Sequence, residues 1–357
     1  MTSAATPSRL SVVGGETDAG PVLRIGARPI GVGCPTFVVA EAGVNHNGDR
    51  SMAAELVDAA DRAGADAIKL QAFDPDALCS HRHRSAERDM LRRYVLTDGD
   101  LAELRDRAAA SGLIFLVTPF GSDQVDRVVQ LGAPAIKVGS GEVTHTPLLR
   151  HIGETALPVL LSTGASDLRD VRRAVTALRR GGCTELALLH CTSVYPAPDD
   201  SLNLRAIVTM REEFGDCVIG YSDHSTGTTA GVAAVALGAA VLEKHLTLDH
   251  HLDGPDHTAS AEPDELARLI REVRRFEQMA GDGVKRPAEQ EGVIGQSLVA
   301  TRALHAGHVV TPGDLTFKRP GWGLRPCQLA QVVGRRLRQD LPADDVLTQE
   351  HVDWSGP

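Results

Sequence analysis

The feature that most constrains the fold is a series of eight short apolar, β-branched runs that alternate with amphipathic segments from Thr36 onward. Such runs, separated by helical patterns, are typical of βα units. We predict eight strands, at Phe37–Glu41, Ala67–Gln71, Ile114–Thr118, Ala135–Val138, Val159–Ser162, Leu186–His190, Cys217–Tyr221 and Ala240–Lys244. Eight βα units predict a (β/α)8 TIM barrel of the α/β class, which takes about 250 residues.

The segments between the runs carry helical patterns, at Ser51–Ala63, Leu101–Ala110, Leu168–Leu178, Thr228–Ala236 and, as the last helix, Asp264–Met279. The phrases AGADAIKLQ, LGAPAIKVGS and LGAAVLEKH each place a glycine where a helix should end, shortly before a strand. This weak repeat supports a series of similar units.

The remaining segments predict a chain of two domains. Residues 1–35 are expected to form a loose tail and a small hairpin (VLRIGARPIGVG), and residues 36–280 the barrel. The polar stretch 281–292 has the composition of a linker. Residues 293–357 then predict a small domain of short strands and turns, with one helical piece near Pro326–Gln331 and a thin apolar core.

Composition excludes several classes of protein. The 37 basic and 47 acidic residues give a formal net charge of −10, without a long Lys/Arg run, which argues against a nucleic-acid-binding surface. The longest apolar stretch, Ala230–Leu242, is too short for a membrane span. Six scattered cysteines without a CxxC pair, and an N-terminus without a secretory pattern, predict a cytoplasmic protein with reduced thiols.

Polar residues follow the predicted strands at the same end. They are Glu41, Lys69, Gln71, Thr118, Lys137, Ser140, Ser162, Thr163, His190, Thr192, Ser222, Asp223, His224, Lys244 and His245. The carboxyl ends of barrel strands meet on one face, where barrel enzymes have their active sites. We therefore predict one active site on this face, the alternative being polar residues that merely mark the strand–loop junctions.

His224 and His245 follow the seventh and eighth strands, which are neighbours in a barrel. Two imidazoles at adjacent strand ends can share one divalent ion, with water and substrate oxygens as further ligands. Such an open, oxygen-rich site favours Mn²⁺ or Mg²⁺ over a closed Zn²⁺ site. The alternative is that these histidines are structural hydrogen-bonding groups.

Lys69 and Lys137 end the second and fourth strands. Burying a lysine without an acidic partner is costly, and an anionic substrate would remove that cost. Hydroxyl groups for a phosphate or carboxylate site are offered by Thr118, Ser140, Ser162 and Ser222. The alternative is an ion pair with Glu41 or Glu142.

The run LDHHLDGPDHT predicts either a second metal site or a solvated loop, with Asp256 the best candidate to reach the active site.

Nine motifs occur in the order VVAEAGVNHNGD, AIKLQAF, FLVTPF, IKVGSGE, LSTGAS, LLHCTSVYPAP, GYSDHSTG, LEKHLT and DGPDHTAS. In this order they resemble the sialic acid synthase family, whose members make nonulosonic acids from phosphoenolpyruvate and a six-carbon sugar. The resemblance covers residues 25–357. The tail, with FKRPGWG, resembles the small antifreeze-like (SAF) domain of N-acetylneuraminate synthase-like enzymes.

The resemblance implies a role for individual residues of this chain. Glu41 matches the active-site carboxylate, and His224 and His245 match the metal ligands. Phosphoenolpyruvate-binding positions fall on Lys69, Thr118, Lys137, Ser140, Ser162 and Ser222. Gln71, Tyr195 and Asp256 match positions that face the sugar. Arg319 matches an arginine that the SAF domain of one subunit places in the partner's active site, which implies a domain-swapped homodimer.

Two departures from the family pattern lie on the acceptor side. Ser193 stands where members that use N-acetylmannosamine commonly have an asparagine that contacts the sugar. The loop from Phe73 to Met90 is shorter than usual and rich in basic residues. The acceptor is therefore open between N-acetylmannosamine, a diacetamido-trideoxyhexose and a less usual sugar.

The function expected from the sequence is a phosphoenolpyruvate-dependent condensation with a sugar aldehyde, by metal-assisted aldol-type attack and C–O cleavage. Glu41, His224 and His245 are the expected catalytic residues. One alternative is a metal-dependent barrel hydrolase, but many of these need an HxH pair after the first strand, where this chain has His46 alone. Another is a non-catalytic carbohydrate-binding protein, which would not need two strand-end lysines and a histidine pair.

Overall fold

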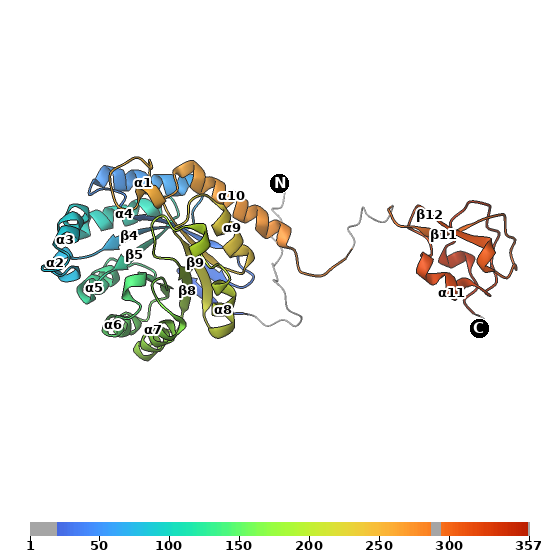
Figure 1. Ribbon diagram of the computed structural model, residues 1–357, viewed down its shortest axis with the longest axis horizontal. Helices are drawn as coiled ribbons and strands as arrows, with labels where there is room; N and C mark the ends of the chain where they lie inside the picture. The colour runs from blue at the N-terminus through green and yellow to red at the C-terminus, as the bar shows by residue number, and fades with distance from the viewer. Residues whose placement is uncertain (1–19, 287–293, 356–357) are drawn as a thin grey trace. The chain divides into compact units, whose positions relative to one another are not determined.

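The computed structural model describes residues 20–286 and 294–355 (Figure 1). The chain divides into two compact units, one ending at Gly283 and the other beginning at Val284, within the predicted linker. The predicted tail at 1–19 and the linker residues 287–292 lie outside the described residues. None of the described helices has the length and apolar character that crossing a membrane requires.

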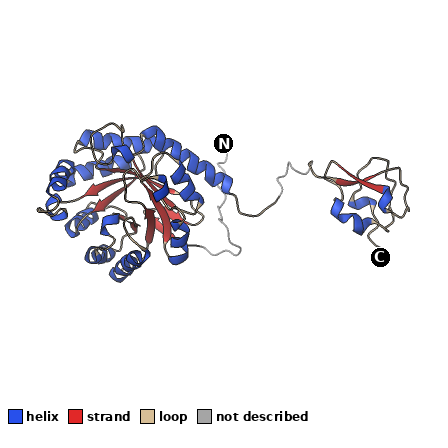
Figure 2. Ribbon diagram, viewed as in Figure 1, coloured by secondary structure: helices blue, strands red, loops and turns tan. Residues whose placement is uncertain are grey.

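The first unit is a closed barrel of eight parallel strands with helices around it (Figure 2). Neighbouring strands follow one another in the order β10-β3-β4-β5-β6-β7-β8-β9. Every predicted strand is present, with ends within two residues of those predicted. The strands are β3 (Phe37–Gly43), β4 (Ala67–Ala72), β5 (Ile114–Pro119), β6 (Ile136–Val138), β7 (Val159–Ser162), β8 (Leu186–Cys191), β9 (Val218–Asp223) and β10 (Val241–His245).

Helices follow the strands and surround the barrel (Figure 1). They are α1 (Arg50–Ala63), α4 (Asp98–Ala110), α5 (Ser122–Gln130), α6 (Thr146–Glu154), α7 (Leu168–Gly181), α8 (Ala206–Glu213), α9 (Thr229–Ala236) and α10 (Pro263–Ala280). The predicted helices are all among them. In α7 the sequence explains where the helix begins and ends. Asp167 and Asp170 form a capping box at its start, and Gly182, with φ of 115°, ends it in a left-handed conformation.

The connection between β4 and α4 contains the basic segment that we expected to be a loop. It folds into two short helices, α2 (Pro75–Leu78) and α3 (Ser85–Leu91). Val44, Phe73 and Tyr94 form a small apolar cluster that anchors this connection to the barrel. The anchoring explains why a segment with so many charges is ordered: its few apolar side chains share one buried contact.

An N-terminal hairpin closes the amino end of the barrel. It consists of β1 (Val22–Ile25) and β2 (Arg28–Gly31), as predicted from VLRIGARPIGVG. Its inward side chains Leu23, Ile25 and Ile30 join a cluster with the apolar residues of the barrel interior, namely Phe37, Val39, Ala67, Leu116, Ala135, Leu160, Ala187, Leu189, Val218 and Val241. The amino end of the interior is therefore apolar, and polar side chains are left to the carboxyl end.

The second unit has a small hydrophobic core of its own. Its regular elements are β11 (Ser297–Ala300), β12 (Leu315–Lys318) and α11 (Leu329–Val332), the last near the predicted helical piece. The core is drawn from the whole unit and comprises Leu298, Ala300, Leu304, Val310, Leu315, Leu324, Val332, Leu337, Leu341, Leu347 and Val352. Isolated bridges such as Val299 to Val346 supply pairing where the sequence suggested further strands.

Candidate active site

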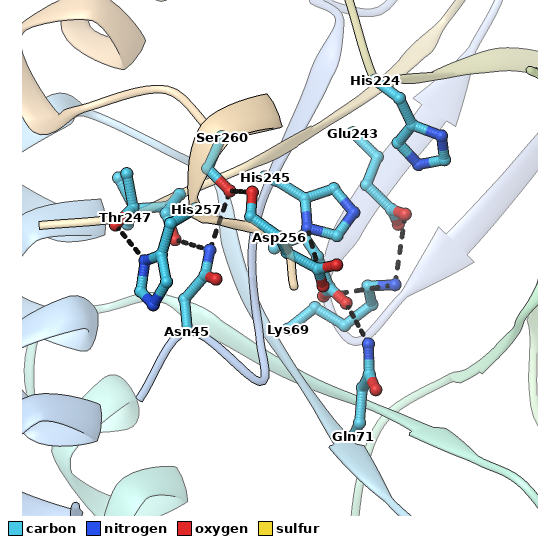
Figure 3. A network of polar contacts seen from close by, with 12 residues as sticks. Asn45, Lys69, Gln71, His224, Glu243, His245, Thr247, Asp256, His257 and Ser260 are labelled. Carbon is cyan, nitrogen blue, oxygen red and sulfur yellow. Dashed lines mark hydrogen bonds and ion pairs between the residues drawn. The ribbon is translucent and has the colours of Figure 1, made fainter. Parts of the chain in front are cut away.

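The register of three neighbouring strands brings three predicted site residues into one row. In β10 and β3, His245 pairs with Glu41, and in β3 and β4, Glu41 pairs with Lys69. Paired residues of a parallel sheet point to the same side. His245, Glu41 and Lys69 are all buried, and the alternation of side chains along the strands points them into the barrel interior, at its carboxyl end. Figure 3 shows the Lys69 ammonium group pointing toward Glu243.

Lys69 lies at the centre of this row. Its Nζ atom is 3.2 Å from Glu41 Oε2 and 3.1 Å from Glu243 Oε1. It also donates a hydrogen bond to Thr118 Oγ1 at 3.3 Å. On the other side, Gln71 Nε2 donates to Glu41 Oε1 at 3.0 Å. The predicted catalytic carboxylate, one predicted phosphate lysine and a predicted sugar-facing amide thus form a single contact network.

Lys137 joins the same network from the opposite side. Its Nζ atom donates to Ser162 Oγ at 2.8 Å and lies 3.5 Å from Glu243 Oε1. Ser222 Oγ donates to the same carboxylate at 3.0 Å. Both lysines and three of the four predicted phosphate-binding hydroxyls, those of Thr118, Ser162 and Ser222, therefore surround one buried carboxylate.

Glu243 is the residue that the sequence analysis missed, and it corrects the interpretation of the lysines. They do have an acidic partner, and for Lys137 it is neither Glu41 nor Glu142. The signal was available: Glu243 lies two residues before His245, and the strand period of two places both side chains inside the barrel. By the same alternation, Lys244 and His190 do not point into the site. Lys244 pairs with Asp223 at 2.9 Å, and His190 Nε2 donates to Leu202 O at 2.7 Å.

Burial and charge shift the pKa values in this network. Burial raises the pKa of Glu243, but Lys137 and Lys69 outweigh it and bring that pKa down to about 2. Burial lowers the pKa of Lys137 to about 8, against the opposing effect of Glu243. Burial also works to lower the pKa of Lys69, but Glu243 and Glu41 raise it instead. At neutral pH the network therefore holds two ammonium groups and the Glu243 carboxylate.

Glu41 differs from Glu243 although both are fully buried carboxylates. Burial raises the pKa of Glu41, Lys69 opposes this shift and Glu243 adds to it. A carboxylate with a raised pKa is a better proton acceptor than an exposed one. The two glutamates thus differ in pKa, and Glu41 takes up a proton more readily than Glu243.

The rings of His224 and His245 lie side by side in a T-shaped arrangement, with ring centroids 5.2 Å apart. His224 Nδ1 lies 2.7 Å from Thr192 O, and since a carbonyl oxygen only accepts, this nitrogen carries the proton. Burial lowers the pKa of His224, and burial together with His224 and Lys69 lowers that of His245 well below its ordinary value. Both rings are therefore neutral at neutral pH, the form in which imidazole binds a metal.

The histidines fit the expected open metal site. His245 Nδ1 is buried and, among the described residues, has no hydrogen-bond partner; Asp256 Oδ2 is 3.7 Å away. His224 is oriented by a carbonyl oxygen, as metal-binding histidines commonly are. In residues 20–286 and 294–355, no three His, Cys, Asp or Glu side chains are placed to hold an ion by themselves. Two protein nitrogens leave further positions to water and substrate.

The predicted sugar-facing residues lie next to the histidines. The ring of Tyr195 stacks on His224 at 4.0 Å and meets the edge of His245 at 5.6 Å. Burial raises the pKa of Asp256, with opposing effects from His224 and Lys69. Gly43, with φ of 52°, lies between Gln71 and Asp256. A Cβ atom at position 43 would be 3.3 Å from Gln71 Nε2 and 3.5 Å from Asp256 Oδ2. Glycine thus keeps the space between these groups free.

Ser140 and Ser193 meet at another glycine, Gly164. Ser140 Oγ accepts a hydrogen bond from Gly164 N at 3.0 Å. A Cβ atom on Gly164 would lie 2.2 Å from Ser193 Oγ, 2.9 Å from Ser140 Oγ and 3.1 Å from Cys191 Sγ. Ser193, assigned to the sugar by resemblance, is therefore a neighbour of a predicted phosphate-binding residue, and Cys191 is a site residue that the sequence analysis did not single out.

Three other expectations have plain outcomes. Arg319 is exposed and belongs to the second unit, so its action on a barrel stays a prediction. The buried ring of His46 accepts a hydrogen bond from Gly48 N at 3.1 Å, and burial lowers its pKa to about 4. Two of the histidines in the run LDHHLDGPDHT have protein partners: His257 hydrogen-bonds Thr247, and His250 lies near Glu262.

Comparisons with known proteins identify the family of this chain. The NeuB family matches residues 56–285, and the SAF domain matches residues 295–353. N,N'-diacetyllegionaminic acid synthase of Legionella pneumophila is 38% identical over 92% of this chain and 98% of its own length. Human N-acetylneuraminate-9-phosphate synthase is 34% identical over 90% of this chain and 94% of its own.

A solved structure extends the agreement to the fold. The crystal structure of N-acetylneuraminic acid synthetase from Leptospira borgpetersenii, in complex with citrate, has 32% identity and a TM-score of 0.73. It covers 76% of this chain and 94% of its own. The expected family is thus confirmed: this chain belongs to the NeuB family of sialic acid synthase-like enzymes and carries a C-terminal SAF domain.

Proposed function

We propose that this chain condenses phosphoenolpyruvate with an open-chain, N-acetylated hexose, giving a nonulosonic acid and phosphate. The acceptor is a sugar such as N-acetylmannosamine or a diacetamido-trideoxyhexose. The observation that carries the proposal is the placement of two buried ammonium groups, ringed by hydroxyls, beside two neutral histidines. The names of the relatives, which are synthases of such acids, support the same reaction.

The phosphoenolpyruvate half would be held by Lys69, Lys137 and the surrounding hydroxyls. Glu41 pairs with Lys69, whereas Glu243 is shared between Lys69 and Lys137, so Lys137 can bind a substrate anion in addition to its shared carboxylate. The hydroxyl groups of Thr118, Ser162 and Ser222 can turn their protons toward phosphate or carboxylate oxygens. Hydrogen bonds between charged partners are about twice as strong as neutral ones, which favours a doubly charged ligand at this place.

The acceptor half would include one divalent ion, Mn²⁺ or Mg²⁺, on His224 and His245. When bound, such an ion supplies Lewis-acid polarisation of a sugar aldehyde. The hydrogen bond from His224 Nδ1 to Thr192 O leaves Nε2 as the metal-binding atom. Tyr195, stacked on His224, and Asp256, beside His245, then border the sugar from the loop side.

The bond changes assign work to the remaining groups. Carbon 3 of phosphoenolpyruvate attacks the aldehyde carbon, the aldehyde oxygen gains a proton, and water adds at carbon 2 and loses a proton. The carbon-2 hydroxyl then loses its proton as the carbonyl bond forms, the bond between carbon 2 and the bridging oxygen breaks, and its electrons leave with phosphate, which takes up that proton. Glu41, with its raised pKa, positions or deprotonates a reactant. Lys69 and Lys137 stabilise the charge that develops on the departing phosphate.

The test is phosphate release from phosphoenolpyruvate with a panel of sugars. Release should require both a sugar and Mn²⁺ or Mg²⁺, and ¹⁸O in the bridging position should appear in the phosphate. A metal-dependent hydrolase would not need phosphoenolpyruvate, and a carbohydrate-binding protein would release nothing. Label retained in the sugar acid would exclude the C–O cleavage.

The active unit would be a domain-swapped homodimer in which Arg319 acts on the partner's barrel. Arg319 is exposed on a unit that has its own core and follows the barrel through a polar segment. Its guanidinium offers a fixed fork of donors that suits a carboxylate or a pair of sugar hydroxyls. A barrel whose site opens only at the carboxyl face also gains from a lid that excludes water.

A further inference from the structure

An ion pair lies directly behind the two histidines, on the outer side of the barrel wall. Lys244 and Asp223 are paired in the register of β10 and β9, and Lys244 Nζ is 2.9 Å from Asp223 Oδ2. In the preceding row of the same register, Glu243 and Ser222 point inward and hydrogen-bond at 3.0 Å. Strands β9 and β10 thus carry one polar pair on the inner face of the barrel wall, toward the proposed active site, and another pair on the outer face.

The outer pair fixes the turn that carries His224. Asp223 Oδ1 accepts hydrogen bonds from Ser225 N at 2.9 Å and from Ser225 Oγ at 2.6 Å. Lys244 Nζ also donates to Ser225 O. The two hydrogen bonds between Asp223 and Ser225 span His224, and Lys244 holds the residues on both sides of it. Lys244 directly precedes His245, so the contacts among Asp223, Ser225 and Lys244, which we call the clamp, join the two histidine-bearing segments.

Neither charged group has access to a substrate. The side chains of Lys244 and Asp223 are 1% and 0% exposed, and they lie on the face of the sheet opposite to Glu243. A buried ion pair contributes little net stability, because the loss of hydration offsets the attraction between the charges. What the pair does supply is a fixed distance between two backbone segments, each attached to one histidine.

We propose that Lys244 and Asp223 are positioning residues that hold His224 and His245 at the separation a divalent ion requires. This inference rests on the metal site of the proposed function. The clamp fixes the backbone positions from which the two imidazole rings extend. The hydrogen bond from His224 to Thr192 fixes the orientation of the His224 ring. Partners that orient metal-binding histidines commonly contribute 10–100-fold to metal affinity.

The experiment is Mn²⁺ binding to the metal-free full-length chain, measured by the electron paramagnetic resonance signal of free Mn²⁺. Asp223→Asn keeps the acceptor for Ser225 but removes the ion pair. The double variant Asp223→Asn/Lys244→Met also removes the ammonium group, so no buried charge is left unpaired and the fold should persist. We expect about 10–100-fold weaker Mn²⁺ binding in both variants, with unchanged circular dichroism.

Asp66→Asn is the matched control. Asp66 precedes β4 at the amino end of the barrel and pairs with Arg28 and Arg274, both at 2.9 Å. This variant should lower the melting temperature and leave Mn²⁺ affinity at the wild-type value. A merely structural role for the clamp predicts that the double variant recovers both stability and Mn²⁺ affinity, which would overturn the inference. A wild-type chain that binds no Mn²⁺ would instead overturn the metal site itself, and the inference with it.

Discussion

The two halves of the proposed site are built from different parts of the barrel. Lys69, Lys137, Ser162 and Ser222 of the phosphate half lie on strands and are at most 3% exposed. In the acceptor half, Ser193 and Tyr195 lie on a loop, and Tyr195 is 44% exposed. Strand residues are fixed by register, whereas loops can change without altering the barrel. If the proposed assignments hold, a rigid phosphoenolpyruvate site is combined with an adjustable sugar site.

The largest expected effect comes from removing a histidine of the acceptor half. His245→Ala should reduce kcat/KM by more than about 100-fold while the chain stays folded, because one of two metal-binding nitrogens is lost. Chelation should abolish turnover, and Mn²⁺ or Mg²⁺ should restore it. His250→Ala, in the nearby loop, serves as the control and should keep its activity. Full activity in a verified metal-free preparation would exclude the metal.

The next test asks whether the acceptor half is completed by a second chain. Arg319→Ala and His245→Ala should each be nearly inactive as homodimers. In a mixed dimer, the intact barrel of the Arg319→Ala chain would receive Arg319 from the other chain, so up to half of wild-type activity should return. Purification on two different tags provides the mixed species. Inactive mixed dimers would show that Arg319 does not act in trans.

The pH dependence tests the phosphate half alone. Burial lowers the pKa of Lys137 to about 8, so raising the pH through that value removes the charge that phosphoenolpyruvate needs. The kcat/KM for phosphoenolpyruvate should therefore fall about tenfold per pH unit above about pH 8. Lys137→Arg, which stays protonated at these pH values, should lose this decline. An identical decline in both proteins would assign it to another group.

The smallest expected effect concerns the loop residue Ser193. Ser193→Asn should change the ranking of acceptor sugars by about 1–3 kcal/mol, since one hydrogen-bonding group discriminates on that scale. Replacing the basic Phe73–Met90 segment should also change the ranking of acceptor sugars. Because Ser193 lies beside Ser140, the KM for phosphoenolpyruvate is the control that separates the halves. A change in that KM alone would move Ser193 into the phosphate half.

The sequence predicts the rigid half of the site better than the adjustable half. Apolar runs with polar ends locate the strands, and barrel closure then brings Lys69, Lys137 and His245 together. Glu243 was not predicted because only strand ends were considered, although the period of two places its side chain inside the barrel with that of His245. The prediction that Lys244 faces the active site is wrong for the same reason, because the alternation along β10 places its side chain on the outer face of the sheet. The contact of Ser193 with Gly164 depends on two loop conformations, which no periodicity in the sequence encodes.

The hairpin under the barrel has a consequence for the kinetics. Leu23, Ile25 and Ile30 close the amino end of the interior, so both substrates must arrive through the carboxyl face. Most of the groups proposed for phosphoenolpyruvate lie on the strands, whereas Ser193, Tyr195 and Asp256, proposed for the sugar, lie on loops. A sugar that bound first would stand between the solvent and the lysines. Steady-state kinetics should therefore be ordered, with phosphoenolpyruvate binding before the sugar and the sugar acid leaving before phosphate.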